Sequence, residues 1–232
     1  MPAHNEAALL ERSVQEVVAD ARSRSLDFEL IVVENGSQDE TAVIAARLAD
    51  EEPEVLVRTL PRADYGLALR TGLLAATGDV VVNFDVDYTD LGFLDAALVR
   101  FGQPDPPAIM VGSKRAPGAH DQRSRARRFV TWGFDLVLRV GFGLGVTDTH
   151  GMKALNRARV LPLAAACRSD GELFDTELIL RAERAGLGVA ELPVTVAERR
   201  PARTSITRRA LRTLAGLARL RLALLRDRPA AG

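Results

Sequence analysis

The chain alternates short apolar runs with stretches in which apolar residues recur at helical spacing. The runs have the length of buried strands and occupy residues 28–33, 55–57, 80–84 and 108–112. The helical stretches occupy residues 7–24, 39–48, 66–76, 91–101 and 174–185. Strands that alternate with helices require crossover connections, which favour parallel pairing. The pattern therefore predicts an α/β fold, with a mostly parallel central sheet and helices on both faces.

Three later segments are less regular. Residues 112–128 are polar and basic, which predicts a mobile loop. Residues 129–140 have the apolar spacing of a helix. Residues 189–196 are typical of an extended segment, although Pro193 interrupts it because proline cannot donate a ladder hydrogen bond.

The length of 232 residues suits one large domain. We expect this domain over residues 1–206. Residues 206–226 have the spacing of a long final helix. The predicted second unit is therefore a basic amphipathic C-terminal helix and tail over residues 207–232.

Charge and cysteine content exclude several classes of protein. The 31 basic and 31 acidic residues give no net charge, which argues against nucleic acid as the partner. The chain has one cysteine, Cys167, so a disulfide within the chain and a cysteine-based zinc site are both excluded. A single cysteine favours a reducing compartment, and no apolar run reaches about 18 residues. We expect a cytoplasmic location, with peripheral binding to the cytoplasmic face of a membrane as a further option.

Two carboxylates, Asp85 and Asp87, directly follow the apolar run at 80–84. On an extended backbone, residues two apart point to the same side. Neighbouring carboxylates repel each other unless a cation lies between them, and oxygen ligands favour Mg²⁺ or Mn²⁺. The sequence therefore predicts a metal site here, and the alternative is a solvated acidic turn.

Polar segments also follow the other predicted strands, where an open parallel sheet binds its ligands. Residues 34–37 read Glu-Asn-Gly-Ser, and residues 112–115 read Gly-Ser-Lys-Arg. Near the N-terminus, residues 2–6 read Pro-Ala-His-Asn-Glu and precede a helix. Turn and capping chemistry would account for each segment taken alone.

Taken together and in order, these segments resemble the motifs of inverting family 2 glycosyltransferases with the GT-A fold. Residues 2–6 resemble the Pro-x-Tyr-Asn-Glu opening of that family, and residues 33–41 resemble its Val-Asp-Asp-Gly-Ser-x-Asp-x-Thr box. Residues 85–87 match its metal-binding Asp-x-Asp. Further similar segments are residues 65–79, 112–115, 148–153, 174–177 and 191–200. The last two are most similar to motifs of dolichol- and polyprenyl-phosphate mannose synthases, and the resemblance covers about residues 1–206.

The resemblance implies a pocket for the nucleotide. Pro2, Ala3 and Glu6 would line it. Glu34 and Asn35 stand where the family has two aspartates, the first of which grips the base or ribose. Glu34 keeps the acid, whereas Asn35 supplies no charge.

The resemblance also implies a site for the diphosphate. Asp85 and Asp87 would hold the metal ion, Mg²⁺ or Mn²⁺, on the diphosphate. His150 stands where serine is usual. Two roles are considered for it, a third metal ligand and a residue of a surface loop. Basic residues that would offset phosphate charge are Lys114, Arg199, Arg200 and Arg203.

The activity implied is transfer of a sugar from a nucleoside-diphosphate sugar to an acceptor. The mannose synthase-like motifs favour a polyprenyl phosphate, whose oxygen is already an anion and needs no general base. A hydroxyl acceptor would need a carboxylate base, and Asp148, Asp175 and Glu177 are candidates. We take Asp87, Asp148 and Glu177 as the candidate catalytic residues. A non-catalytic nucleotide-sugar-binding protein is the third reading.

One further expectation concerns each end of the chain. In the resembled fold, the Pro-x-x-Asn-Glu loop emerges from a central strand, and Met1 stands where that strand would end. We therefore expect a truncated first strand and a slot in the sheet.

Near the other end, leucine and alanine residues share one helix face, and arginines gather opposite. This favours binding to a membrane surface; the alternative is a helix packed on the sheet with its arginines in water. The face comprises Leu211, Leu214, Ala218, Leu222 and Leu225, widened by Leu217, Leu220 and Leu224.

Overall fold

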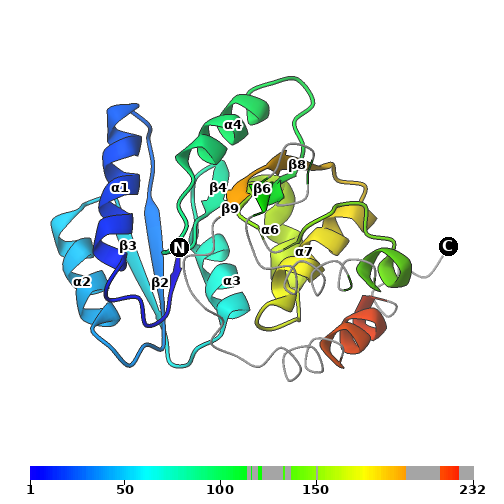
Figure 1. Ribbon diagram of the computed structural model, residues 1–232, viewed down its shortest axis with the longest axis horizontal. Coiled ribbons are helices and arrows are strands. Elements are labelled where there is room, and N and C mark those ends of the chain that lie inside the picture. Colours follow the sequence, from blue (N-terminus) through cyan, green and yellow to red (C-terminus); the bar gives the residue numbers. More distant parts are fainter. Residues whose placement is uncertain are drawn as a thin grey trace.

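The computed structural model describes residues 1–113, 116, 120–121, 133, 137–149, 151–196 and 215–224. Figure 1 shows two groups of strands with helices on both sides. Lys114, His150, Arg199, Arg200 and Arg203 lie outside the described residues, as does much of the predicted loop at 112–128. No helix in the described part of the chain is both long enough and apolar enough to cross a membrane.

The first group is a parallel sheet in the order β1-β2-β3. Its ladder pairs Pro2 with Val33 and Leu30 with Val55. The elements in chain order are β1 (Pro2–Ala3), α1 (Leu10–Ser23), β2 (Leu30–Asn35), α2 (Thr41–Glu51), β3 (Val55–Leu60) and α3 (Tyr65–Ala75).

The second group is a mixed sheet in the order β4-β7-β5-β8. Within it, β7 runs antiparallel to β4 and β5, whereas β5 and β8 are parallel. A separate parallel pair joins β6 and β9. The elements are β4 (Val80–Asn83), α4 (Leu91–Phe101), β5 (Ile109–Ser113), β6 (His120–Asp121), β7 (Lys153–Asn156), α6 (Arg157–Ala166), α7 (Leu173–Arg184), β8 (Val189–Pro193) and β9 (Thr195–Val196). Residues 137–142 and 215–224 are also helical.

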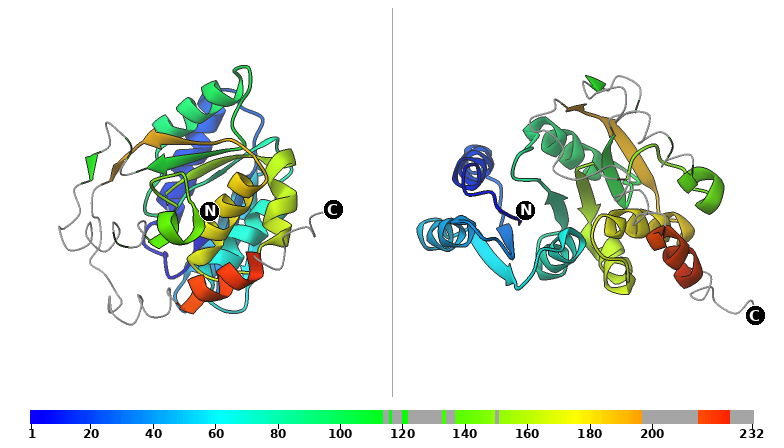
Figure 2. Two further views of the ribbon diagram at one scale, coloured as in Figure 1. Left: turned by 90° about the vertical axis from the view of Figure 1, so that its right-hand side faces the viewer. Right: turned by 60° about the horizontal axis from the view of Figure 1, so that its bottom comes forward.

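Alternate residues of β2 pack on opposite layers, which explains its continuous apolar run. Leu30 and Val32 join a core with α1 and α2, and Ile31 and Val33 join a core with α3. Figures 1 and 2 accordingly show α3 across β2 from α1 and α2. A strand buried on both faces has no polar positions to alternate with. The predicted α/β class is therefore confirmed.

The antiparallel strand β7 and the helix α6 were not predicted. Two features of the sequence explain why its pattern did not indicate these elements. The four residues of β7 begin with Lys153, a residue type that seldom enters a buried strand. Helix α6 contains Pro162, which usually marks a helix boundary, and only Val160 and Ala164 are fully buried on it.

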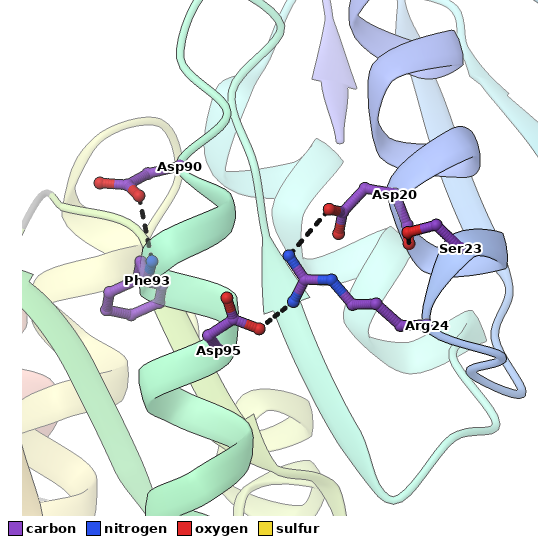
Figure 3. A network of polar contacts seen from close by, with 6 residues as sticks. All are labelled: Asp20, Ser23, Arg24, Asp90, Phe93 and Asp95. Carbon is purple, nitrogen blue, oxygen red and sulfur yellow. Dashed lines mark hydrogen bonds and ion pairs between the residues drawn. The ribbon is translucent and has the colours of Figure 1, made fainter.

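An arginine at the end of α1 links the first group of elements to the second. Arg24 contacts Asp20 of α1 at 2.8 Å and also pairs with Asp95 of α4 (Figure 3). In the same view, Asp90 caps α4 by accepting a hydrogen bond from the backbone N–H of Phe93 at 3.0 Å. The Arg24–Asp95 contact is exposed, and exposed ion pairs contribute little to the free energy of unfolding.

A cavity of about 170 Å³ lies between β2 and β4, where the described strands of the two sheets share no ladder. Residues of β2, β4, α3 and α7 line it, together with Met1. The buried α-amino group of Met1 donates a hydrogen bond to the carbonyl of Ile31 at 2.8 Å. Burial lowers the pKa of this amine from 8.0 to about 6.

We predict that the 232-residue chain becomes more stable as the pH rises from 6 to 8. In this window the unfolded amine binds a proton that the folded amine does not, so raising the pH favours the folded state. A lowering of the pKa from 8.0 to about 6 corresponds to at most about 2.7 kcal/mol. Urea unfolding at both pH values measures the difference. An Nα-acetylated chain is the matched control, and equal pH dependence in the two chains would contradict the prediction.

Candidate active site

The segment at 2–6 is joined to the turn that follows β2. The ring Nδ1 of His4 donates to the carbonyl of Asn35 at 2.8 Å. Asn5, in the left-handed region with φ 54°, accepts at its Oδ1 from the backbone N–H of Gln38 at 2.8 Å. The backbone N–H of Glu6 donates to Thr41 Oγ1 at 2.8 Å. The segments at 2–6 and 34–41 therefore form one unit at the carboxyl ends of β1 and β2.

Glu34 and Asn35 end β2 rather than follow it, and both are buried. Glu34 Oε1 accepts from the backbone N–H of Ser37 at 2.6 Å. Asn35 Oδ1 accepts from the backbone N–H of Asp64 at 2.8 Å. In this structure both side chains thus shape the loops that surround the strand end. An amide oxygen serves this purpose without adding a charge.

Asp85 and Asp87 lie on a turn, so the expectation of an extended backbone is wrong. The backbone N–H of Tyr88 donates to the carbonyl of Asp85 at 3.1 Å and closes the turn. Between the two acids, Val86 is buried, and its carbonyl accepts from Ser13 Oγ at 2.5 Å. The turn is therefore anchored on α1 at the carboxyl end of β4.

The carboxylate of Asp85 is held by Tyr65, the first residue of α3. The hydroxyl of Tyr65 donates to Asp85 Oδ1 at 3.0 Å. Burial raises the pKa of Asp85, and the charge of Asp87 acts in the same direction, while Tyr65 and Lys153 oppose them. Burial and the nearby carboxylates raise the pKa of Tyr65 well above 10, so its hydroxyl remains a donor.

A buried ion pair joins β7 to α7 near this turn. Lys153, 1% exposed, lies 2.9 Å from Asp175 Oδ1 and donates to the carbonyl of Gly151 at 2.8 Å. Burial raises the pKa of Asp175, against the effect of Lys153, and the charges of Asp85 and Asp148 raise it further. The sequence analysis missed Lys153 as a site residue. Two signals pointed to it: the chain has only two lysines, and Lys153 ends the segment at 148–153 that is similar to a family motif.

The three candidate bases have different surroundings. Asp148 is buried in the loop before β7 and lies close enough to Asp175 to affect its pKa. Asp175 is paired with Lys153.

The contacts of the third candidate, Glu177, do not fit a base. Its carboxylate is fully buried and accepts from the backbone N–H groups of Arg168 at 3.0 Å and Ser169 at 2.6 Å. It also pairs with Arg181 at 2.8 Å, and the side chains of both residues are largely buried. These contacts favour a structural role for Glu177.

The acidic turn fits a hard divalent cation. Asp85 and Asp87 offer carboxylate oxygens, which Mg²⁺ and Mn²⁺ accept as ligands. Among the residues that the structure describes, no group of three or more His, Cys, Asp and Glu could hold a metal ion. Two protein carboxylates are typical where substrate phosphates complete the coordination. The donor set therefore suits a metal shared with a diphosphate.

Known proteins share this architecture. The solved structure of glucosyl-3-phosphoglycerate synthase from Mycobacterium tuberculosis has a TM-score of 0.70 at 22% identity, and covers 100% of this chain and 81% of that chain. The same enzyme in complex with Mn²⁺, UDP-glucose and phosphoglyceric acid has a TM-score of 0.69 at 23% identity, covering 95% and 77%. At such identities the likeness shows the fold, and it confirms the expected GT-A architecture.

Relatives by sequence include the glycosyltransferase AglD of Haloferax volcanii, 34% identical over 201 residues. The dolichyl-phosphate β-glucosyltransferase ALG5A of Trichomonas vaginalis is 26% identical over 205 residues. Each match covers 84% of this chain, which spans 32% of the first relative and 63% of the second. An uncharacterized glycosyltransferase of Mycobacterium tuberculosis is 32% identical over 181 residues, with 78% of both chains covered. The model of glycosyl transferase family 2 matches residues 1–161. The chain therefore belongs to glycosyl transferase family 2.

Proposed function

We propose that the chain transfers a sugar, with inversion, from a nucleoside-diphosphate sugar to a polyprenyl phosphate in a metal-dependent reaction. The observation that carries this proposal is the anchored Asp85–Asp87 turn of a family 2 chain, next to the unit formed by residues 2–6 and 34–41. Met1 and Asp85 lie within electrostatic range, and Ala3 shares a hydrophobic cluster with Val86. The name of AglD supports the reaction class, and the names of the dolichyl-phosphate glucosyltransferases support the acceptor as well.

On the donor side, Pro2, Ala3, Glu6, Glu34 and Asn35 would surround the nucleotide. Their loops are fixed to each other by the hydrogen bonds described above, so the pocket walls would move little on binding. Such preorganisation lowers the entropy lost when a ligand binds.

On the diphosphate side, Asp85 and Asp87 would bind Mn²⁺ or Mg²⁺. When bound, the metal would stabilise the negative charge of the leaving diphosphate. The Mn²⁺ complex of the structural neighbour supports this assignment. Basic residues proposed to offset the remaining phosphate charge are Lys114, Arg199, Arg200 and Arg203.

On the acceptor side, a polyprenyl phosphate presents an oxygen that is already an anion. No side chain then has to remove a proton, and the structural contacts of Glu177 are compatible with this acceptor. A hydroxyl acceptor is the second candidate. It would require Asp148, which is buried beside the Lys153–Asp175 pair, as general base.

For the membrane, we propose a contact through the exposed face of the C-terminal helix. Leu217, Leu220 and Leu224 are buried in a hydrophobic cluster with residues of α7, so this part of the apolar arc belongs to the core. Leu222, in contrast, is 57% exposed, and Ala218 beside it is exposed too.

Basic and apolar side chains adjoin this exposed face. Arg219 and Arg221 are exposed on the same helix. A side chain at Gly141 would come within 3.9 Å of Arg221, which places residues 137–142 beside the helix, and Val140 there is 81% exposed. Basic and apolar groups side by side suit an anionic lipid surface.

The test of the proposed function is a transfer assay with a panel of nucleotide sugars, a polyprenyl phosphate and Mn²⁺. We expect a polyprenyl-phosphate sugar as product, and we expect Asp87→Ala to abolish its formation while the melting profile stays that of the wild type. The control is Asp50→Ala, which removes an exposed carboxylate from α2. Transfer that persists in EDTA, or a wild-type rate in Asp87→Ala, would refute the metal assignment.

Glu177→Gln should lower stability far more than turnover. The substitution leaves Arg181 largely buried without its anion, and breaking a buried ion pair costs about 3–5 kcal/mol. Urea unfolding measures the loss, and the rate per folded molecule is compared at a temperature below the transition. A turnover loss above roughly 100-fold at unchanged stability would instead identify Glu177 as a base, since that is the scale of general-base catalysis.

Binding to vesicles that contain anionic lipid should weaken as salt is added, because salt screens the arginines. We expect Leu222→Glu to reduce binding, since it places a charge in the apolar part of the contact. Val43→Glu on α2, where Val43 is 71% exposed, is the matched control. Equal sedimentation of both variants with the vesicles would contradict the proposed contact.

A further inference from the structure

Tyr65 is the first residue of α3, and its hydroxyl is the donor to Asp85 Oδ1 at 3.0 Å. Asp85 lies on the turn after β4, so the bond joins the start of α3 to that turn. The other tyrosine of the chain, Tyr88, donates to Asp90 Oδ2 at 3.2 Å. The two tyrosines therefore bond different carboxylates near the same turn.

The backbone around Tyr65 is fixed by the preceding residue. Asp64 is the N-cap of α3, and its Oδ1 accepts from the backbone N–H of Leu67 at 2.9 Å and of Gly171 at 3.0 Å. The backbone N–H of Asp64 itself donates to Asn35 Oδ1. The start of α3 is thus tied both to the end of β2 and to the loop before α7.

The residue that follows Tyr65 allows the helix to approach this loop closely. A Cβ added to Gly66 would lie 2.4 Å from the carbonyl oxygen of Gly171 and 2.8 Å from the Cβ of Phe174. Such distances leave no room for a side chain, so α3 packs against the backbone of the loop. Tyr65 is therefore a rigidly held donor and does not need to be ordered when Asp85 binds a ligand.

We propose that Tyr65 is a positioning residue that holds the Asp85 carboxylate in the orientation that binds the metal ion. The inference rests on the proposed function, because it takes Asp85 as a metal ligand. With Oδ1 engaged by the hydroxyl, rotation of the carboxylate about its χ2 angle is restricted, and its remaining lone pairs keep one direction. Loss of a residue that hydrogen-bonds a metal ligand typically lowers metal affinity or activity by about 10–100-fold.

Tyr65→Phe tests the proposal, because it removes the hydroxyl and keeps the ring. Binding of Mn²⁺ in the presence of UDP is followed by the loss of the free Mn²⁺ signal in electron paramagnetic resonance. We expect the dissociation constant for Mn²⁺ to rise by about 10-fold or more. Tyr88→Phe, which removes a hydroxyl bonded to Asp90, should bind Mn²⁺ as the wild type does.

A second measurement separates positioning from a general loss of structure. If Tyr65 acts on metal affinity, the turnover of Tyr65→Phe should return to the wild-type value at saturating Mn²⁺. A deficit that persists at saturating Mn²⁺ would overturn the proposal, as would an unchanged dissociation constant.

Asp85→Asn separates a failure of the role proposed for Tyr65 from a failure of the proposed metal site. If Asp85→Asn loses Mn²⁺ binding while Tyr65→Phe keeps it, the metal assignment stands and the role of Tyr65 falls. If Asp85→Asn and the wild type bind Mn²⁺ alike, the metal assignment fails and the role of Tyr65 fails with it.

Discussion

The ion pair between Lys153 and Asp175 sets the charge balance on which the site depends. Lys153 is buried, and its charge acts on Asp85 as well as on its partner. Beyond the effect of burial, the charges of Asp85 and Asp148 raise the pKa of Asp175, and the charge of Asp87 raises the pKa of Asp85. One lysine therefore balances only part of the negative charge. A divalent cation would neutralise the remainder. The fold that brings these carboxylates together therefore favours the binding of a metal ion.

Rigid anchoring is the second condition for such a site, because like charges would otherwise move apart. The turn that bears Asp85 and Asp87 is fixed on α1 through Ser13 and on α3 through Tyr65. Asn35 connects the end of β2 to the start of α3. These bonds are made by side chains of helix ends and strand ends, and the layers of the sheet fix those ends. Packing of the apolar faces therefore determines the geometry of the polar site.

The sequence was sufficient for the fold class and for the places where polar residues gather. Apolar runs buried on both faces, such as β2, leave a clear signal, and α4 (Leu91–Phe101) has the predicted bounds. The acids of the turn at 85–87 were found because they follow an apolar strand. Their backbone conformation was not, since a turn closed by Tyr88 and an extended strand end have the same residues.

Long-range pairing explains the remaining differences. Lys153 pairs with Asp175, which lies far from it along the chain, so no local spacing indicates this partner. Glu177 and Arg181 are four residues apart on one helix, and this spacing does not by itself tell a buried ion pair from an exposed one. The leucines of the C-terminal helix show the same ambiguity, because an apolar face can meet a core or a membrane, and Leu217 meets the core.

The central claim is that the Asp85–Asp87 turn and a nucleoside diphosphate share one divalent cation. The most direct measurement is the affinity for UDP, determined by calorimetry with Mn²⁺ and with EDTA. The account predicts that Mn²⁺ tightens UDP binding by at least about 10-fold, equivalent to about 1.4 kcal/mol, and that UDP tightens Mn²⁺ binding by the same factor. Equal affinity for UDP with and without the metal would contradict it.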